Sequence, residues 1–178
     1  MAENNDSEAP ANRFNVVIVG GGSAGIATAA SILKRNRKIS LAIIDPADDH
    51  YYQPGWTMVG GGAFSAEFTH RKEKDLIPAG AQWIQAAVSS FDPENNAVLT
   101  ADGQKIGYDV LIVCPGIKLD WEAIDGLPET LGKNGVTSNY RYDLAPYTFR
   151  LVKEMTGGTA LFTQPPMPIK CAGAPQKA

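Results

Sequence analysis

A cysteine near the end of the chain has neighbours that could make its sulfur reactive. Cys171 lies in the stretch IKCAGAPQKA, directly after Lys170 and six residues ahead of Lys177. Cations and helix N-termini lower a thiol pKa and favour the reactive thiolate, and Pro175 suits the first turn of a helix. The residue types therefore fit a redox-active thiol, while the plain alternative is an unreactive loop cysteine.

A glycine-rich turn near the other end could hold a phosphate. The run Gly20-Gly21-Gly22-Ser23-Ala24-Gly25 fits the pattern G-x-G-x-x-G. The first glycine allows a tight turn, the second lets the backbone approach a pyrophosphate, and the third lets helix and strand pack closely. N–H groups at the helix N-terminus attract the anion. Because Asp45 follows about twenty residues later at a predicted strand end, we predict a dinucleotide site in which Asp45 binds a ribose.

The elements around this turn predict one strand–helix–strand unit. The β-branched run Phe14–Val19 is typical of a strand buried on both faces, and Leu41–Ile44 is a second such strand. The alanine-rich segment Ser23–Lys34 between them predicts a helix. The crossover between two such parallel strands is right-handed in nearly all known cases.

Three further strands are predicted downstream, over Trp83–Phe91, Ala97–Thr100 and Lys105–Val113, with turn signals between them. They form an antiparallel meander that ends in the small-residue turn CPG. This ending resembles the first FAD-binding segment of flavoproteins with two dinucleotide-binding domains, so FAD is preferred to NAD. Another short strand, Thr159–Thr163, then resembles the start of the second domain. The predicted fold class is α/β, a Rossmann-like FAD-binding unit with an added meander and the start of a second Rossmann-like domain.

The chain is predicted to divide into four parts. These are a disordered tail (1–12), an incomplete FAD-binding domain (13–120), a connecting segment (121–156) and the truncated start of a second dinucleotide-binding-like domain (157–178). The tail is polar and acidic and has no apolar stretch of the kind found in signal peptides. No apolar run approaches the roughly 20 residues that span a bilayer.

Composition excludes several classes of function. The 178 residues carry a net charge of −3, which gives no electrostatic basis for nucleic-acid binding. Two cysteines provide neither a metal cluster nor a disulfide framework, so we predict no metal site and a mostly reducing, intracellular setting. The mixed-charge run 70–75 is interpreted as solvated surface.

The motifs GGGSAG, IIDP, HYYQPGWTMVGGGA and IKCAGAPQK, in this order, resemble sulfide:quinone oxidoreductase. The resemblance begins near Arg13 and covers only an N-terminal part of a family member. It implies a flavoenzyme that oxidises sulfide and passes two electrons through FAD to a membrane quinone. It further implies that Cys171 is the redox cysteine that carries the persulfide. The implied cofactor contacts are Ser23 and Ala24 with the pyrophosphate, Asp45 with the ribose, Gln53 against the cofactor and Val88 with the adenine.

The resemblance also implies partners and a location. The substrates would be sulfide and a quinone, either ubiquinone or menaquinone. The partner cysteine, the quinone pocket and the membrane-binding helices would lie in a part of the enzyme absent here, so we expect these residues to be inactive alone. Peripheral attachment to a bacterial or mitochondrial inner membrane is expected. Exposed apolar surface at the missing part would favour homo-oligomers.

Three other functional interpretations also fit part of the sequence. An NADH:quinone reductase or a cytochrome-linked sulfide dehydrogenase would share the glycine loop, and a truncated, non-catalytic product would share all the motifs. The segment Gln164–Pro168 (QPPMP) stands where a second glycine loop would be expected. Its prolines lack the N–H groups that bind phosphate, which disfavours NAD.

Several further residues could have a structural role or a role at the cofactor. Cys114 ends an apolar strand and is interpreted as packing, with a second redox cysteine or a flavin link as alternatives. His50 is expected to shape the cofactor loop, and His70 to be solvated. Three aromatic residues could pack around a flavin or fill a core: Tyr51, Tyr52 and Trp56. Arg141 and Tyr142 receive no role.

Overall fold

The computed structural model describes residues 12–164, which belong to two compact units. Among the described residues, the first unit comprises 12–50 and 71–118, and the second comprises 51–70 and 119–164. The chain thus leaves the first unit for some twenty residues and returns to it. Each unit is described by itself.

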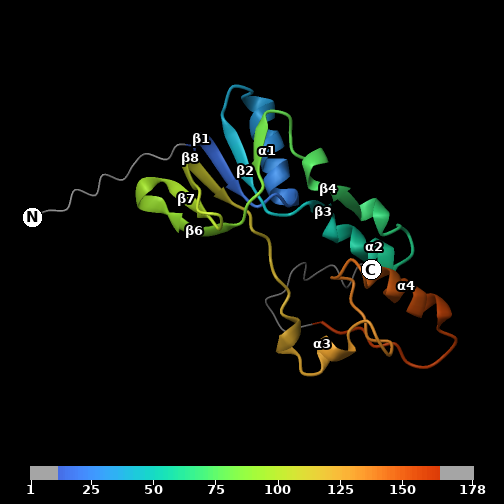
Figure 1. Ribbon diagram of the computed structural model, residues 1–178. Helices are drawn as coiled ribbons and strands as arrows, with labels where there is room; N and C mark the ends of the chain where they lie inside the picture. Colours follow the sequence, from blue (N-terminus) through green and yellow to red (C-terminus); the bar gives the residue numbers. More distant parts are fainter. Residues whose placement is uncertain (1–11, 165–178) are drawn as a thin grey trace, which may run out of the picture. The chain divides into compact units, whose positions relative to one another are not determined.

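The first unit is built on a six-stranded sheet (Figure 1). The strand order is β5-β2-β1-β8-β7-β6. The bounds are β1 Asn12–Val19, β2 Leu41–Ile44, β5 Ala81–Ile84, β6 Val88–Asp92, β7 Ala97–Thr100 and β8 Lys105–Val113. Four neighbouring strands, β5, β2, β1 and β8, are parallel, whereas β7 is antiparallel to both β8 and β6. A mostly parallel sheet extended by an antiparallel hairpin confirms the predicted α/β class.

Strand β1 lies at the centre because its side chains are apolar on both faces. Successive side chains of a strand point to opposite faces of the sheet. Val16 and Ile18 pack with Ala29 and Leu33 of the helix that covers one face. On the other face, the cluster contains Val17, Val19, Ala42, Ile44, Ile84, Ala86, Val98, Ile106 and Tyr108. The run of branched residues thus supplies both halves of the core.

Helix α1, Ser23–Arg35, connects β1 to β2 and lies against the parallel part of the sheet (Figure 1). It starts after Gly22 and ends where the Asn36 N–H donates to the Ile32 carbonyl at 2.9 Å. The predicted helix and its two flanking strands are confirmed, and the bounds differ by no more than two residues.

The prediction of a single strand over residues 83–91 is wrong, because parts of two strands, β5 and β6, lie in this stretch. Strand β5 pairs in parallel with β2, while β6 pairs in antiparallel fashion with β7. Between them the Ala86 N–H bonds the Ile84 carbonyl at 2.9 Å and closes a tight turn. The antiparallel meander therefore consists of β6, β7 and β8, and β8 also pairs with β1.

The second unit is built from short helices. Its elements are η1 Gln53–Gly55, α2 Trp56–Gly60, η2 Glu67–Thr69, η5 Trp121–Ala123, α3 Leu127–Thr130 and α4 Ala145–Glu154. A two-stranded sheet of β3 (Asp49–Tyr51) and β4 (His70–Lys72) spans the two points where the chain passes between the units. Two 3-10 turns, η3 Glu73–Asp75 and η4 Pro93–Asn95, belong to the first unit.

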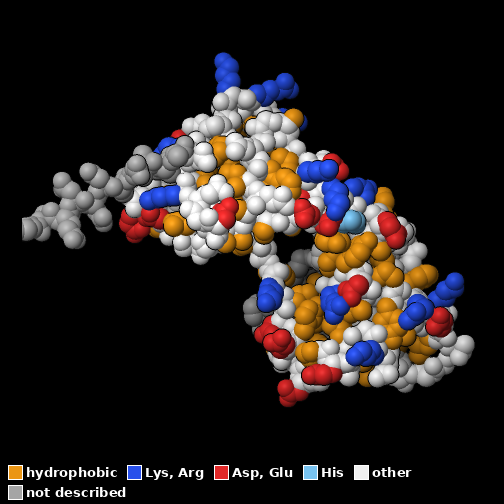
Figure 2. All heavy atoms as spheres, in the orientation of Figure 1, with side chains coloured by type: hydrophobic (Ala, Val, Ile, Leu, Met, Phe, Trp, Pro, Cys, Tyr) orange, Lys and Arg blue, Asp and Glu red, His pale blue; other side chains and the backbone are white. Residues whose placement is uncertain are grey.

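Helix α2 packs against α4, and two glycines at or just after the end of α2 lie close to neighbouring side chains. A Cβ at Gly62 would overlap the ring of Phe149, and one at Gly60 would overlap the amide of Asn139. Apolar side chains also reach the surface of this unit, where Figure 2 shows them gathered over α2 and α4. The exposed ones include Tyr51, Tyr52, Met58, Phe64, Phe68, Phe149 and Val152.

The strand predicted over Thr159–Thr163 is not formed. Leu161 and Phe162 are 84% and 87% exposed, and no other segment within residues 12–164 pairs with this stretch. Apolar content alone does not make a strand, because its N–H and C=O groups need a neighbouring strand. The predicted domain division at this point stays a prediction. In the described part of the chain, no helix has the length and apolar character needed to cross a bilayer.

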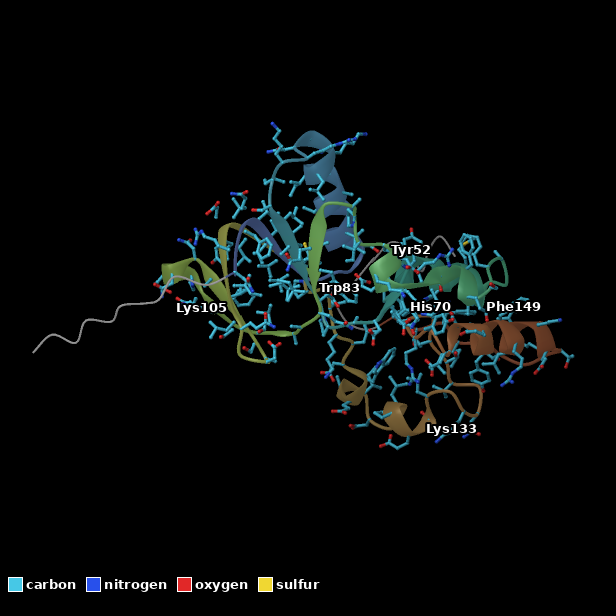
Figure 3. All side chains as sticks on the ribbon, turned by 45° about the horizontal axis from the view of Figure 1, so that its top comes forward. Tyr52, His70, Trp83, Lys105, Lys133 and Phe149 are labelled. Carbon is cyan, nitrogen blue, oxygen red and sulfur yellow. The ribbon has the colours of Figure 1, made fainter. Side chains whose placement is uncertain are left out.

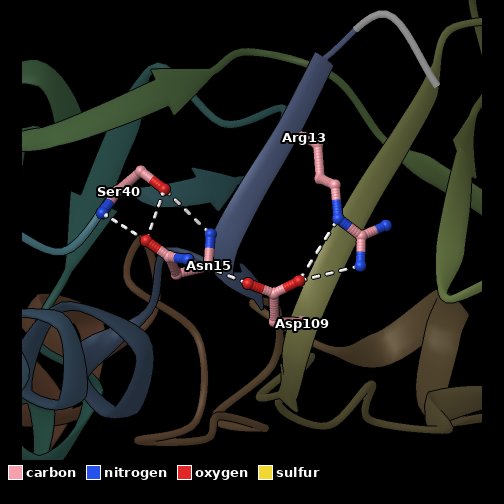
Figure 4. A network of polar contacts seen from close by, with 4 residues as sticks. All are labelled: Arg13, Asn15, Ser40 and Asp109. Carbon is pink, nitrogen blue, oxygen red and sulfur yellow. Dashed lines mark hydrogen bonds and ion pairs between the residues drawn. The ribbon is translucent and has the colours of Figure 1, made fainter. Parts of the chain in front are cut away.

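A polar network fastens the beginning of β1 to β8 and β2 (Figure 4). Arg13 donates two hydrogen bonds to Asp109, from Nε at 3.2 Å and from Nη2 at 2.8 Å. The Asn15 amide donates to the other oxygen of Asp109 at 2.8 Å, and its carbonyl accepts from Ser40. The bonds from Asn15 and Arg13 hold the pKa of Asp109 below its ordinary value.

Asp109→Asn is expected to lower the melting temperature slightly at neutral pH. A carboxyl with a lowered folded-state pKa stabilises the fold above its unfolded pKa, near 3.9, and loses that contribution as pH falls. The difference from wild type should therefore shrink towards strongly acidic pH. Thermal unfolding of both proteins across that range measures it, with the exposed Asp125→Asn as control. An equal loss in the control would contradict this account.

Candidate dinucleotide-binding site

The glycine loop is shaped by contacts that only glycine allows. Gly20 has φ +103°, and a Cβ there would overlap the carbonyl of Cys114. Its N–H donates to the Ile44 carbonyl at 2.9 Å, while the Cys114 N–H donates to Val19 at 2.7 Å. The loop therefore lies at the carboxyl ends of β1, β2 and β8, the edge of a parallel sheet where ligands bind in folds of this kind.

Gly22 and Gly25 have different surroundings. A Cβ at Gly25 would overlap the carbonyl oxygen of Gly20, so this glycine lets α1 approach the loop. A Cβ at Gly22 would meet no atom within 4 Å. The exposed residues Ser23 and Ala24 follow directly in the first turn of α1. Open space in front of a helix N-terminus is what an approaching pyrophosphate needs.

Asp45 is fixed beside the loop at the end of β2. Its Oδ2 accepts from the Gly21 N–H at 2.6 Å, and its Oδ1 accepts from the Ala47 N–H at 2.8 Å. The Trp83 indole N–H donates to the Asp45 carbonyl at 3.0 Å, and Figure 3 labels this tryptophan. Each carboxylate oxygen keeps a further lone pair. The carboxylate is therefore held in place and can still accept hydroxyl hydrogens from a ribose diol.

Most of the predicted cofactor residues belong to the first unit. The first unit holds Gly20, Gly22, Ser23, Ala24, Gly25, Asp45 and Val88. Val88 is half-buried and packs against the apolar cluster on the face of the sheet opposite α1. Gln53 belongs to the second unit, so its predicted contact with the cofactor stays a prediction.

The interpretation of residues 70–75 as solvated surface is wrong for Glu73. This side chain is 2% exposed, and its Oε2 lies 3.1 Å from Nδ1 of His50. Mixed charge gave no sign of this burial, since charged runs are usually solvated. The partner histidine, 23 residues earlier, was the only available signal, and no spacing rule connects the two.

His70, labelled in Figure 3, is also not simply solvated, because it belongs to an aromatic cluster in the second unit. Its ring stacks on Tyr51 at 5.0 Å between centroids, and Tyr51 lies 4.8 Å from Tyr142. Trp56 contacts both tyrosines, at 6.1 Å and 6.3 Å. Burial, and then the nearby Glu67 and Tyr51, raise the pKa of Tyr142. The cluster gives Tyr142 the packing role that its sequence did not reveal.

Three buried polar atoms in the second unit lack partners among the described residues. Two of them, Oε1 of Gln53 and the indole N–H of Trp56, are three residues apart along η1 and α2, and the third is Oδ1 of Asn139. Buried polar groups are nearly always hydrogen-bonded, so an unpaired one calls for a water or a ligand group. This is consistent with the prediction that Gln53 lies against a cofactor.

Cys171 lies outside the described residues, as do Lys170, Pro175 and Lys177. Cys114 contributes to the site through its backbone, and its half-buried thiol is unpaired within the described part of the chain. Among residues 12–164 no group of three or more His, Cys, Asp or Glu side chains could hold a metal ion. The described residues therefore provide a candidate nucleotide-binding loop with the carboxylate of Asp45 beside it.

Comparison with known proteins agrees with this geometry. A family model described as pyridine nucleotide-disulphide oxidoreductase matches residues 14–152. The chain is 49% identical over 168 residues to the mitochondrial sulfide:quinone oxidoreductase of Dictyostelium discoideum and 41% identical over 166 residues to that of Mus musculus. Each match covers 93% of this chain and 37% of the relative. The resemblance inferred from the motifs is confirmed over this N-terminal part.

The fold is also similar to solved structures. The sulfide:quinone oxidoreductase of Aquifex aeolicus superimposes with a TM-score of 0.61 and 25% sequence identity. The match covers 81% of this chain and 32% of the bacterial enzyme. The chain thus spans little more than a third of the length of the curated relatives it matches.

Proposed function

Because the chain belongs to the pyridine nucleotide-disulphide oxidoreductase family, whose members are FAD-binding oxidoreductases, we propose that it is the FAD-binding N-terminal part of a sulfide:quinone oxidoreductase. The enzyme oxidises sulfide to a protein persulfide and passes two electrons to a membrane quinone. The observation that carries the proposal is the glycine loop with its fixed acid, set within a segment 49% identical to such an enzyme. The NADH-linked alternatives have no comparable support.

FAD fits the residues that are present. The open space at Gly22 and the exposed first turn of α1 receive the pyrophosphate through backbone N–H groups. Asp45 accepts hydrogen bonds from the adenosine ribose, and Val88 contacts the adenine. Gln53 offers its unpaired Oε1 to the cofactor. When bound, FAD supplies the two-electron chemistry that side chains alone cannot.

Cys171 is proposed as the sulfur that carries the persulfide. Sulfide attacks a disulfide between Cys171 and a second cysteine, so that one sulfur gains the incoming sulfur atom while the other leaves as a thiolate. The two electrons then reside on the departing thiolate, and FAD held by the glycine loop and Asp45 would supply the two-electron acceptor that this thiolate needs. The second cysteine is expected in the part of the enzyme beyond these 178 residues, and the chain alone is expected to be inactive.

The enzyme's partners follow from the same proposal. They are sulfide and a membrane quinone, either ubiquinone or menaquinone. We place the enzyme peripherally on a mitochondrial or bacterial inner membrane, and three relatives are named as mitochondrial. Apolar side chains exposed at the end of β8, such as Val110 and Val113, support contact with further chain or a second copy.

An absorption spectrum tests the proposal. The purified chain is expected to bind FAD, and the flavin of the complete enzyme should bleach on anaerobic addition of sulfide and recover with quinone. NADH is the matched control and should leave the flavin oxidised. Bleaching by NADH without a response to sulfide would replace the proposal with a nicotinamide-linked reductase.

A further inference from the structure

A carboxyl group is buried behind the glycine loop. Glu73 begins η3 just after β4, and its N–H is anchored on the Asp48 carbonyl at 2.9 Å. One carboxyl oxygen, Oε2, meets Nδ1 of His50, whose side chain is 10% exposed. The other, Oε1, has no hydrogen-bond partner within residues 12–164. A charged carboxylate is costly to bury in this way, so the protonation state of the pair matters to its surroundings.

The unpaired oxygen faces the glycine loop itself. Oε1 of Glu73 is the atom nearest to the position that a Cβ of Gly21 would take, and the Cβ of Asp45 lies 2.9 Å from the same position. The Gly21 N–H donates to Oδ2 of Asp45 at 2.6 Å. Glu73 is therefore in contact with the middle of the loop, one residue before the glycine that a pyrophosphate would approach.

Burial and charge act on this carboxyl in opposite directions. Burial raises the pKa of Glu73, the nearby His50 lowers it, and the negative charge of Asp45 raises it again, with a net upward direction. His50 and Asp45 are the two titratable side chains that act on it.

Three other charged side chains near Glu73, Asp48, Asp49 and Lys72, have partners of their own. Asp48 accepts a hydrogen bond from Gln85 at 2.6 Å, and Lys72 pairs with Asp49 at 2.6 Å. The glycine loop contributes no titratable side chain. The charge next to the loop is thus set by His50, Glu73 and Asp45.

The number of protons on the pair decides that charge. With one proton shared between His50 and Glu73, the pair is neutral, whether the proton is on the imidazole or on the carboxyl. Without that proton the pair carries one negative charge, in a water-poor site where charges interact strongly. A dinucleotide brings the negative charges of its pyrophosphate to the loop. Binding should therefore favour the protonated, neutral pair.

From this geometry we infer that the His50–Glu73 pair is a positioning element that keeps one proton behind the glycine loop and links dinucleotide binding to the uptake of that proton. The inference rests on the proposed binding of FAD. In the free chain the pair loses its proton as pH rises, while the bound pyrophosphate holds the proton to higher pH. FAD affinity should then fall with rising pH, by at most about tenfold per pH unit for a single proton.

Isothermal calorimetry of FAD binding to the chain tests this link directly. Titrations at the same pH in two buffers with different ionisation enthalpies give the number of protons taken up. The titrations are repeated from about pH 5 to about pH 9, a range above the ordinary glutamate pKa, because burial raises the pKa of Glu73. We expect wild-type protein to take up a fraction of a proton when FAD binds. Its affinity for FAD should decrease as the pH rises.

Glu73→Gln keeps the shape of the side chain and removes the titrating carboxyl. It should abolish the uptake, flatten the pH profile and bind FAD more tightly than wild type at alkaline pH. His50→Gln is the second variant, because loss of the imidazole raises the pKa of Glu73 further, and it should abolish the uptake in this pH range as well. Glu94→Gln, on the turn between β6 and β7, is the control and should behave like wild type. Thermal melts verify that each variant is folded.

The outcomes separate this inference from the proposed function. FAD binding without proton uptake at any pH, or uptake that persists in Glu73→Gln, would overturn the inference alone. Failure of the wild-type chain to bind FAD at any pH would overturn both. Uptake that disappears in both variants and remains in Glu94→Gln would establish the link.

Discussion

Gly22→Ala is expected to weaken FAD binding by about 100-fold or more without unfolding the chain. A Cβ at this position meets no protein atom within 4 Å, and its φ of −63° is allowed for alanine. The added methyl group would instead project into the space that a pyrophosphate needs, and a 100-fold loss corresponds to about 2.8 kcal/mol. Unfolding should change by no more than about 1 kcal/mol, the cost of a poorer N-cap. Flavin-fluorescence titration and thermal melting measure the two effects.

Gly25→Ala is the matched comparison, because it adds the same methyl group on the protein side of the loop. Its Cβ would overlap the Gly20 carbonyl oxygen, so α1 must move away from the loop. Overpacking of this kind costs about 1–3 kcal/mol, and the melting temperature should fall together with FAD binding. If Gly22→Ala left FAD binding intact, the glycine loop would not be the pyrophosphate site, and a strongly lowered melting temperature would contradict the open space at Gly22.

The first third of the fold was predictable because its signals are local. A branched apolar run, a glycine turn and an alanine-rich helix determine β1, the loop and α1, and the structure differs only at the ends. The position of Asp45 followed from the same unit, since parallel strands end at one edge of the sheet. The fixed orientation of its carboxylate, bonded to Gly21 and Ala47, could not be read from spacing.

Strand pairing was harder to predict because it depends on distant partners. Residues 83–91 have strand-forming composition throughout, yet β5 pairs with β2 while β6 pairs with β7. Nothing within the stretch indicates that its two halves choose partners about 40 residues before and about ten residues after it. The stretch 159–163 shows the converse, since apolar residues without a neighbouring strand remain irregular and exposed.

Two residues that support the site without being predicted to touch a ligand were not identified from the sequence. Glu73 lies in a mixed-charge run that gave no sign of its burial, and Trp83 lies in a strand that gave no sign of its hydrogen bond to Asp45. Both reach the site through the fold, Glu73 through the β3–β4 pair and Trp83 through the pairing of β5 with β2. Motif reasoning identifies groups that touch a ligand, whereas groups that orient them are recognised only in three dimensions.

Cys171→Ser in the complete enzyme is expected to abolish reduction of the flavin by sulfide, by about a thousandfold or more. A serine hydroxyl forms neither a disulfide nor a persulfide, and its oxygen is far less nucleophilic than a thiolate at neutral pH. FAD affinity should not change, because the glycine loop and Asp45 are untouched. Anaerobic stopped-flow absorption with sulfide, beside a flavin titration, separates the two effects.

Cys114→Ser is the matched control because it makes the same chemical change at the only other cysteine of the sequence. Cys114 supports the glycine loop through its N–H bond to Val19 and through its carbonyl below Gly20, and serine keeps both. Sulfide should therefore still bleach the flavin in this variant. Loss of the response in Cys114→Ser but not in Cys171→Ser would move the sulfur chemistry to the end of β8, beside the glycine loop, and would assign Cys171 a structural role.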